Sequence, residues 1–234
     1  DFMSGIKRCL PAVNVGDTRY YLDGAHLDGD RVVATNGHQL RIVQHSATIA
    51  HRLTIPTKAA TKIVAMFADG CEVRTSASAI SFSTANLSLR TKVAEGEYPA
   101  YRRVVEGCMA DHHSTVSVRP EEFSDALARA VAIKASGEKS GSFINIQLRF
   151  RESEIEFFTR NNDGEEGSDF ALCDRLSGKD SDIAFNGAYL VSSIQSLDCA
   201  KVEIAYGSPS SPIIMRAAGS TVEDARLIMP RHFA

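Results

Sequence analysis

The sequence predicts an α+β protein with two similar domains, and three observations carry this prediction. Several segments alternate polar and apolar residues with a period of two, which is typical of half-buried antiparallel strands. Other segments place their apolar residues on one face of a helix. The order helix, hairpin strands, helix, strands occurs twice along the chain. Each half is therefore expected to pack two helices on one face of antiparallel sheets.

The predicted helices lie in four segments, 2–13, 55–67, 119–136 and 186–197. In the first, Pro11 should shorten or kink the helix near its end. In the second, Lys58 and Lys62 lie one turn apart on the polar side. In the third, Pro120 suits the first helical turn. In the fourth, Asn186 has the chemistry of an N-cap.

The predicted strands lie in the alternating segments 31–36, 71–93, 143–160, 201–207 and 212–218. The segment 18–43 is interpreted as two strands followed by a tight turn at Asn36-Gly37. The stretch 104–115 is polar and without period, so it predicts a break between domains 1–105 and 106–234. His112 and His113 fall in this break, where a solvated linker is the favoured interpretation.

Composition bounds the class of protein. The chain has 234 residues, 44% hydrophobic and 24% charged, which suits a soluble globular protein of one or two domains. No apolar run approaches the ~20 residues of a membrane helix, and no secretion signal is visible. The five cysteines are scattered without a C-x-x-C pair, so a reducing, cytoplasmic location is expected. The first residue is Asp1, so we expect a piece of a longer protein.

One cluster has the composition of a metal site. Asp23, His26, Asp28 and Asp30 could supply oxygen and imidazole ligands to a cation. The same stretch, DGAHLDGD, has the composition of a turn between two strands, and we favour that interpretation. Nucleophile, zinc-protease, P-loop and dinucleotide-binding motifs are all absent from the sequence. We therefore expect no catalytic residues, no cofactor and no metal.

Three distant segments resemble one family. They are TRYYLDGAHLDGDRVVATNGHQLRIV at 18–43, EGEYPAYRRVV at 95–105 and LIMPRHFA at 227–234. In this order they resemble the bacterial sliding clamp, the β subunit of DNA polymerase III. The resemblance covers nearly the whole chain and corresponds to the middle and C-terminal thirds of a three-domain clamp. The N-terminal third and the first strand of the middle domain have no counterpart here.

The resemblance implies a DNA clamp fold and a function without catalysis. Such a clamp encircles double-stranded DNA and confers processivity on the replicative polymerase. The net charge of −3 does not exclude this function, because a ring needs positive charge only on its inner wall. The alternative is a clamp-like peptide-binding adaptor that does not encircle DNA. Charge on the helices distinguishes the two, since a clamp needs Lys and Arg there.

The resemblance also implies a hydrophobic pocket for short partner peptides. Partners would be a replicative polymerase subunit, the clamp loader and repair proteins. The family has Asp-Gly-His-Arg where this chain has Asn36-Gly37-His38-Gln39, so one rim contact would be lost at Gln39. The expected pocket residues are Leu22, Thr35, Gly37, His38, Leu40, Pro99, Arg103, Val104, Leu227, Met229 and Pro230.

DNA contacts are expected on the polar helix faces and on one strand segment. A charged helix face is often merely solvated, which is the competing interpretation for each cation. Tyr21 could also be buried in its strand. The expected DNA-binding residues are Lys7, Arg8, Arg19, Tyr20, Lys58, Lys62 and Arg129.

The resemblance finally implies a ring of six similar domains. The full-length protein is expected to be a homodimer whose C-terminal domain, near Ala132 and Ile133, pairs with the N-terminal domain of its partner. Three two-domain chains would be another way to reach six domains.

Overall fold

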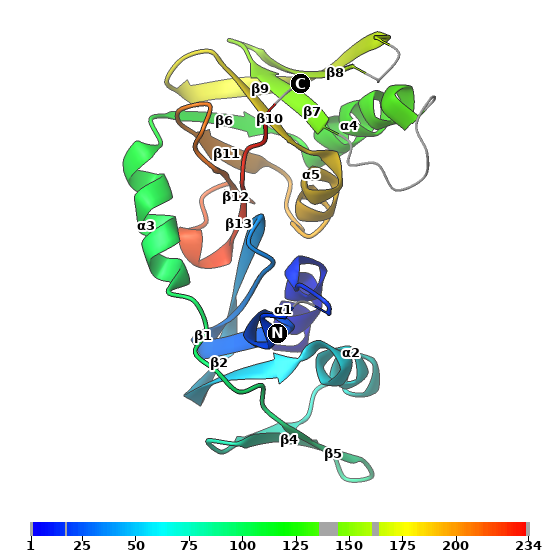
Figure 1. Cartoon of the computed structure of the whole chain (residues 1–234), viewed down its shortest axis with the longest axis vertical. Coiled ribbons are helices and arrows are strands. Elements are labelled where there is room, and N and C mark those ends of the chain that lie inside the picture. Colours follow the sequence, from blue (N-terminus) through cyan, green and yellow to red (C-terminus); the bar gives the residue numbers. More distant parts are fainter. Residues whose placement is uncertain (1, 17, 136–144, 161–163, 233–234) are drawn as a thin grey trace. The chain divides into compact units, whose positions relative to one another are not determined.

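A computed structural model describes residues 2–16, 18–135, 145–160 and 164–232, without the side chains of residues 133–135. Three predicted segments extend outside this description: the helix at residue 136, the strand at residues 143 and 144, and the C-terminal segment at residues 233 and 234. The chain divides into two compact units, residues 1–101 and 102–234. Figure 1 shows helices and antiparallel strands in both units, which confirms the predicted α+β class.

The first unit contains two α-helices, two short 3-10 helices and five strands. α1 and α2 contact each other, and the three short strands form a separate sheet in the order β3-β4-β5. The elements are α1 (Phe2–Cys9), η1 (Leu10–Ala12), η2 (Tyr20–Leu22), β1 (Gly24–Thr35), β2 (Gln39–Pro56), α2 (Thr57–Met66), β3 (Glu72–Thr75), β4 (Ala79–Ser83) and β5 (Ser88–Lys92).

Both predicted helices of the first unit are present. α1 gives way to a 3-10 turn at Leu10, one residue before Pro11, as expected from the missing amide hydrogen of proline. Its buried face includes Phe2 and Ile6, and α2 contributes Ile63 to the same core. Phe82 from β4 stacks on Phe2 with ring centroids 6.4 Å apart. The helices thus cover one apolar core and leave their polar faces outside.

The long hairpin β1–β2 corrects the predicted turn at DGAHLDGD. These residues belong to one continuous strand, which pairs antiparallel with β2 from Gly24 onward. The register shifts on either side of Gly29, whose φ of +67° accommodates a bulge that other residues resist. Ala25 and Leu27 point into the core, so burial keeps the strand extended. The glycine therefore marks a bulge, and the tight turn follows at Asn36-Gly37, as predicted.

The second unit begins within a helix that the sequence did not predict. α3 (Tyr101–Asp111) occupies most of the polar stretch at 104–115. Tyr101, Val105 and Cys108 are buried on one narrow stripe of this helix, and the other positions are largely polar. His112, expected in a solvated linker, is half-buried and its Nε2 lies 2.7 Å from the carbonyl oxygen of Pro212. The break is therefore a structured helix.

The remaining elements of the second unit are two helices, one 3-10 helix and a run of antiparallel strands in the order β13-β12-β11-β6-β9-β8-β7-β10. They are β6 (Ser114–Val118), α4 (Pro120–Ala135), β7 (Asn145–Phe150), β8 (Glu154–Arg160), β9 (Glu166–Ser177), β10 (Ser181–Asn186), α5 (Gly187–Ile194), β11 (Val202–Tyr206), β12 (Ile213–Ala217), η3 (Val222–Asp224) and β13 (Ala225–Ile228).

The strand β9 belongs to two sheets. Its first part, from Glu166 to Leu172, pairs with β8. Its second part, from Cys173 to Ser177, pairs with β6. One long strand thus joins the sheet that contains β7 and β10 to the sheet that contains β11, β12 and β13.

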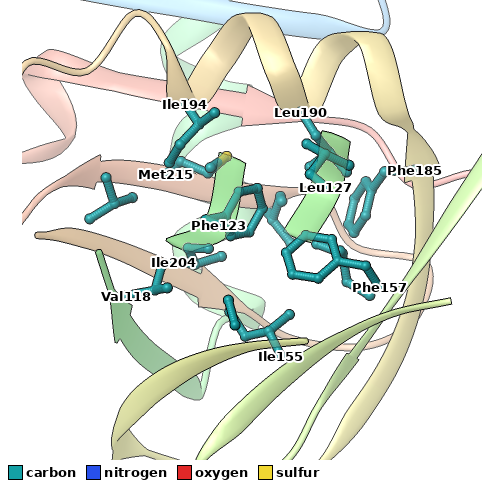
Figure 2. Close-up of a cluster of buried hydrophobic side chains, with 14 of the residues drawn as sticks. Val118, Phe123, Leu127, Ile155, Phe157, Phe185, Leu190, Ile194, Ile204 and Met215 are labelled. Atoms are coloured by element: carbon teal, nitrogen blue, oxygen red, sulfur yellow. The ribbon is translucent and has the colours of Figure 1, made fainter. Parts of the chain in front are cut away.

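The core of the second unit is apolar and rich in aromatic rings. Phe123 of α4 meets Phe157 of β8 edge to face at 4.8 Å, and Phe150 stacks on Tyr206 at 4.0 Å. Figure 2 shows Leu190 and Ile194 of α5, with Phe123 and Leu127 of α4, gathered into this cluster. The predicted N-cap is present, since Asn186 Oδ1 accepts a hydrogen bond of 3.0 Å from Ala188 N.

Candidate functional site

The turn between β1 and β2 carries the first group of predicted peptide-binding residues. The Thr35 hydroxyl donates to the carbonyl of Gln39 at 2.7 Å and accepts from Gly37 N at 3.1 Å. Asn36 Oδ1 accepts from His38 N at 2.9 Å and from Gln39 N at 3.0 Å. These bonds fix the turn and leave Gly37 and His38 exposed. The loop therefore presents its main chain and one imidazole to solvent.

Two leucines lie near the ends of these strands. Leu22 is the last residue of η2 and is 3% exposed, and Leu40 on β2 is 6% exposed. Because both side chains are buried, a ligand could reach only their edges. Gln39 is also buried, and its Nε2 donates to the carbonyl of Pro11 at 3.0 Å. At the position where the family has arginine, this chain thus has a glutamine whose hydrogen bond links β2 to η1.

Arg19 was predicted to contact DNA, and the structure places it beside the turn. A β-carbon added to Gly37 would lie 3.8 Å from Nη1 of Arg19. Tyr20, which follows Arg19, is 58% exposed, and its ring meets Tyr21 edge to face at 6.1 Å. The guanidinium therefore adds a cation next to the exposed turn between β1 and β2.

Pro99 lies in a segment that we call the strap, residues 94–101. The strap leaves the sheet at Ala94, whose amide donates to the carbonyl of Thr54 at 2.8 Å, and ends at the first residue of α3. Pro99 itself is exposed, and its carbonyl accepts from Tyr101 N at 2.7 Å. Proline fixes its own φ, so a short exposed stretch is held in one conformation here.

Three of the four candidate metal ligands are engaged with protein side chains. His26 Nδ1 lies 3.0 Å from the Thr54 hydroxyl. Asp28 accepts from Arg52 Nε and from the Tyr101 hydroxyl, each at 2.8 Å. Asp30 accepts from Arg31 at 2.7 Å and from Gln44 at 2.8 Å. Within the described ranges, no cluster of three or more His, Cys, Asp or Glu side chains could hold a metal ion.

The remaining predicted peptide-binding residues lie on α3 and at the end of β13. Arg103 and Val104 are exposed on the outer side of α3. Leu227 is buried in β13, whereas Met229 is 39% exposed just after the strand. An exposed, unbranched thioether can adapt to varied apolar partners. Val104 and Met229 thus offer apolar contact area that the unit itself does not bury.

Arg226, which the sequence reasoning missed, fixes the strand that precedes Met229. Its side chain is fully buried. Nε donates to the Ser196 hydroxyl at 2.7 Å and Nη1 donates to Asp224 at 2.8 Å. A buried arginine needs such partners, because an unpaired buried charge is costly. All four residues of β13 are buried, so a period-two pattern does not mark Arg226 in the sequence.

The cations predicted to bind DNA differ in their surroundings. Lys7 on α1 and both Lys58 and Lys62 on α2 are exposed, and Arg8 on α1 is partly buried. By contrast, Arg129 on α4 forms an ion pair with Asp169, which raises the pKa of the guanidinium. The four cations of α1 and α2 lie in the first unit and Arg129 in the second, so the structure brings only the first four together on two contacting helices.

Two units, each with helices packed on antiparallel strands, define the class of the chain as clamp-fold domains. The family model described as the DNA polymerase III beta subunit, central domain, matches residues 1–100. The model described as the C-terminal domain of the same subunit matches residues 110–231. The chain therefore belongs to the DNA polymerase III beta subunit family.

Curated relatives agree with this assignment. The beta sliding clamp of Escherichia coli strain K12 is 26% identical over 239 residues, covering 96% of this chain and 63% of the relative. The beta sliding clamp of Synechococcus elongatus is 25% identical over 246 residues, covering 97% of this chain and 62% of the relative. The chain thus spans less than two thirds of the length of these relatives.

Solved structures show the same fold. The sliding clamp of C. crescentus superposes with a TM-score of 0.88 at 20% identity, covering 99% of this chain and 63% of that chain. The Streptococcus pyogenes beta subunit superposes with a TM-score of 0.85 at 24% identity, again covering 99% and 63%. At these identities the likeness supports the fold alone.

Proposed function

We propose that this chain supplies the middle and C-terminal domains of a DNA sliding clamp, with limits 1–105 and 106–234. The observation that carries the proposal is the succession of the family's central and C-terminal domains along one chain. The clamp encircles double-stranded DNA and tethers the replicative polymerase. It performs no catalysis itself, uses no cofactor, and acts in the cytoplasm. Among the described helices, none is long and apolar enough to cross a membrane.

The first unit supplies the attraction for DNA in this proposal. Lys7, Arg8, Lys58 and Lys62 lie on two helices that contact each other and contain no acidic residue. Cations on such a surface contact phosphates, which carry no sequence information. Contacts of this kind allow sliding, because every position along the duplex offers the same partner. The acidic balance of the whole chain then keeps the remaining surface from binding DNA.

Partner proteins bind through short peptides in this proposal. The residues of the Asn36–His38 turn, with Pro99, supply one group of contacts, and Arg103, Val104 and Met229 supply another. Such a surface suits a short extended peptide with leucine or phenylalanine side chains. Support comes from a solved relative, since the Bartonella birtlesii clamp, 21% identical with a TM-score of 0.86, is described as bound to griselimycin. The partners would be a polymerase subunit, the clamp loader and repair proteins.

Assembly follows from the length of the relatives. The full-length protein is proposed to be a homodimer that closes the ring with three domains from each copy. The end of α4, where Ala132 is exposed, belongs to the surface that would pair with the partner; the side chain of Ile133 lies outside the described residues. A light-scattering mass for the full-length protein tests this, and a trimer of the 234-residue chain retained on circular DNA would replace it.

Retention on DNA tests the whole proposal. The full-length protein is loaded onto nicked circular DNA and passed through a sizing column, before and after the circle is linearised. A clamp stays on the circle and slides off the free ends. Equal retention on both forms, or a preference for one sequence, would contradict encirclement. Peptide binding without retention on the circle would instead support the adaptor alternative.

A further inference from the structure

The strap is held to the first unit by more contacts than a connecting segment needs. Beyond the bond at Ala94, Gly96 adopts a φ of +101°, which favours glycine. A β-carbon at this position would lie 3.5 Å from the side chain of Tyr21. The backbone of the strap is therefore laid closely against η2 at the position of Gly96.

The second contact is a stacked pair of rings. The rings of Tyr98 and His26 lie 4.2 Å apart between centroids and are tilted by only 6°. His26 is buried in β1, and Thr54 of β2 holds its Nδ1. The ring of Tyr98 is partly exposed while its hydroxyl oxygen is buried. Burial also raises the pKa of Tyr98, an effect that the main chain of Thr35 partly offsets.

The third contact is a buried hydrogen bond to a carboxylate. The hydroxyl of Tyr101 donates to Asp28 Oδ2 at 2.8 Å, and both side chains are buried. The other oxygen of Asp28 accepts from Arg52, whose side chain is 75% exposed. Bonds to a charged acceptor are stronger than neutral ones, and burial removes competing water. One carboxylate therefore has an inner partner on the strap and an outer partner on β2.

These contacts bracket the exposed proline. Tyr98 immediately precedes Pro99, and Tyr101 follows it by two residues. Both tyrosines face the first unit, while Pro99 and Ala100 are exposed. Tyr101 is also the first residue of α3, the helix that carries Arg103 and Val104. The inward residues of the strap thus hold it against the first unit, and its outward residues are exposed to a ligand.

We propose that His26, Tyr98, Asp28 and Tyr101 are positioning residues that preorganise the strap so that Pro99 meets the partner peptide in its bound conformation. This inference rests on the proposed peptide-binding function. Preorganisation raises affinity because the conformational cost of ordering the strap is met before the peptide arrives. If the strap were released in most molecules, only the remaining fraction could bind the peptide. The apparent dissociation constant would then equal the intrinsic constant divided by that fraction.

A matched pair of variants on one carboxylate tests the proposal in the full-length protein. Tyr101→Phe removes the bond between the strap and Asp28, and Arg52→Gln removes the outer partner of the same group. With Tyr101→Phe, we expect strap amides between residues 95 and 101 to exchange with solvent about tenfold faster, and the dissociation constant of a leucine/phenylalanine-containing peptide to rise about tenfold. With Arg52→Gln, both quantities should stay at the wild-type value.

A second pair tests the stacked rings. Tyr98→Phe keeps the ring on His26 and should retain peptide affinity, whereas Tyr98→Leu should lose affinity by about as much as Tyr101→Phe. Failure of the conservative variant to retain affinity would contradict the role of the stack. Unchanged strap exchange or unchanged peptide affinity in Tyr101→Phe would overturn the positioning role, even if thermal stability fell.

The peptide site itself is tested separately with Leu22→Ala and Met229→Ala. If these weaken the peptide and Tyr101→Phe does not, the positioning proposal fails alone. If none of the three variants changes peptide affinity, the proposed peptide site fails and the positioning proposal fails with it. The exchange rates of the strap then still show whether Asp28 anchors it.

Discussion

The helices of the two units have similar places in their folds and different charge. α1 and α2 of the first unit carry Lys7, Arg8, Lys58 and Lys62 and no acid. α4 of the second unit starts with Glu121 and Glu122, and α5 has no charged residue. The same architecture can therefore present a cationic surface in one unit and a nearly neutral one in the other. If the chain lines a DNA channel, its first unit should dominate the attraction.

The largest expected effect is on DNA. Replacing Lys7, Arg8, Lys58 and Lys62 together by glutamine should lower the slope of log affinity against log salt by about 3 to 4, because each phosphate contact releases a counterion. The variant should therefore lose DNA affinity relative to the wild type, and this fold-loss should be about 100 times larger at 50 mM than at 200 mM salt. Binding of the full-length protein to a DNA duplex across a salt series measures this.

The control for that prediction lies in the second unit. Arg119 and Arg129 are paired with Glu122 and Asp169, so glutamine at both positions should change the salt slope little. An equal loss in this double variant would erase the contrast between the units.

Peptide binding should depend on two of the proposed contact residues, Leu22 and Met229. Leu22→Ala combined with Met229→Ala should weaken a leucine/phenylalanine-type peptide by about 2 kcal/mol, mainly through Met229, because a buried apolar anchor contributes about 1.5–3 kcal/mol and Leu22 offers the ligand only its edge. Met229 is exposed in the free protein and should cost little stability, whereas Leu22 is buried and should cost more. Calorimetric titration measures the affinity, and thermal unfolding reports the stability of each single variant. Unchanged affinity in the double variant would remove both residues from the site.

Acid should destabilise the first unit through His26. Burial lowers the pKa of His26 from 6.5 to about 4, Asp28 opposes this shift and Arg52 adds to it. The unfolded chain therefore takes up the proton first as pH falls. The stability that depends on neutral His26 is fully present above about pH 6.5. Up to about 3 kcal/mol of it is lost between pH 6.5 and 4.

Hydrogen exchange in each unit as a function of pH measures this loss. Other groups in the first unit act in the same direction, since burial also lowers the pKa of His45, with Asp30 opposing. His26→Phe, which keeps a ring against Tyr98, should flatten the pH dependence. If stability in His26→Phe depends on pH as steeply as in the wild type, another group causes the loss of stability in acid.

The smallest predicted effect compares two helix starts. Asn186 caps α5 with its side chain, whereas α2 follows Pro56 and has no side-chain cap. Asn186→Ala should cost the second unit about 1 kcal/mol. Pro56→Ala removes no capping side chain at the start of α2, although it adds one backbone N–H, so no cap is lost there. Denaturant unfolding of both variants checks the difference.

Local patterns predicted the helices of both units because an apolar face needs only the spacing of a few residues. Residues 186–197 gave both the cap and the buried face of α5. α3 was not predicted because its buried stripe is narrow. The stripe consists of Tyr101, Val105 and Cys108, and Gly107 lies within the helix. Helix stability there depends on packing that the sequence pattern does not display.

The candidate site was predictable in part for the same reason. The turn at Asn36-Gly37 follows from local chemistry, so its exposed residues were placed from sequence. The strap contacts were not, because Tyr98 meets His26 and Tyr101 meets Asp28 across more than 70 residues of chain. Such pairings form only when the chain folds back on itself, and local sequence patterns do not reveal them.

The sharing of β9 between two sheets also limits where the chain can change length. An inserted residue in 169–171 would turn every following side chain of β9 to the opposite face, and it would do so in both sheets at once. Around Gly29 the hairpin already accommodates an irregular register, so an added residue there can be absorbed locally. Among natural variants of this chain, insertions and deletions should therefore accumulate at 28–31 and be nearly absent from the middle of β9.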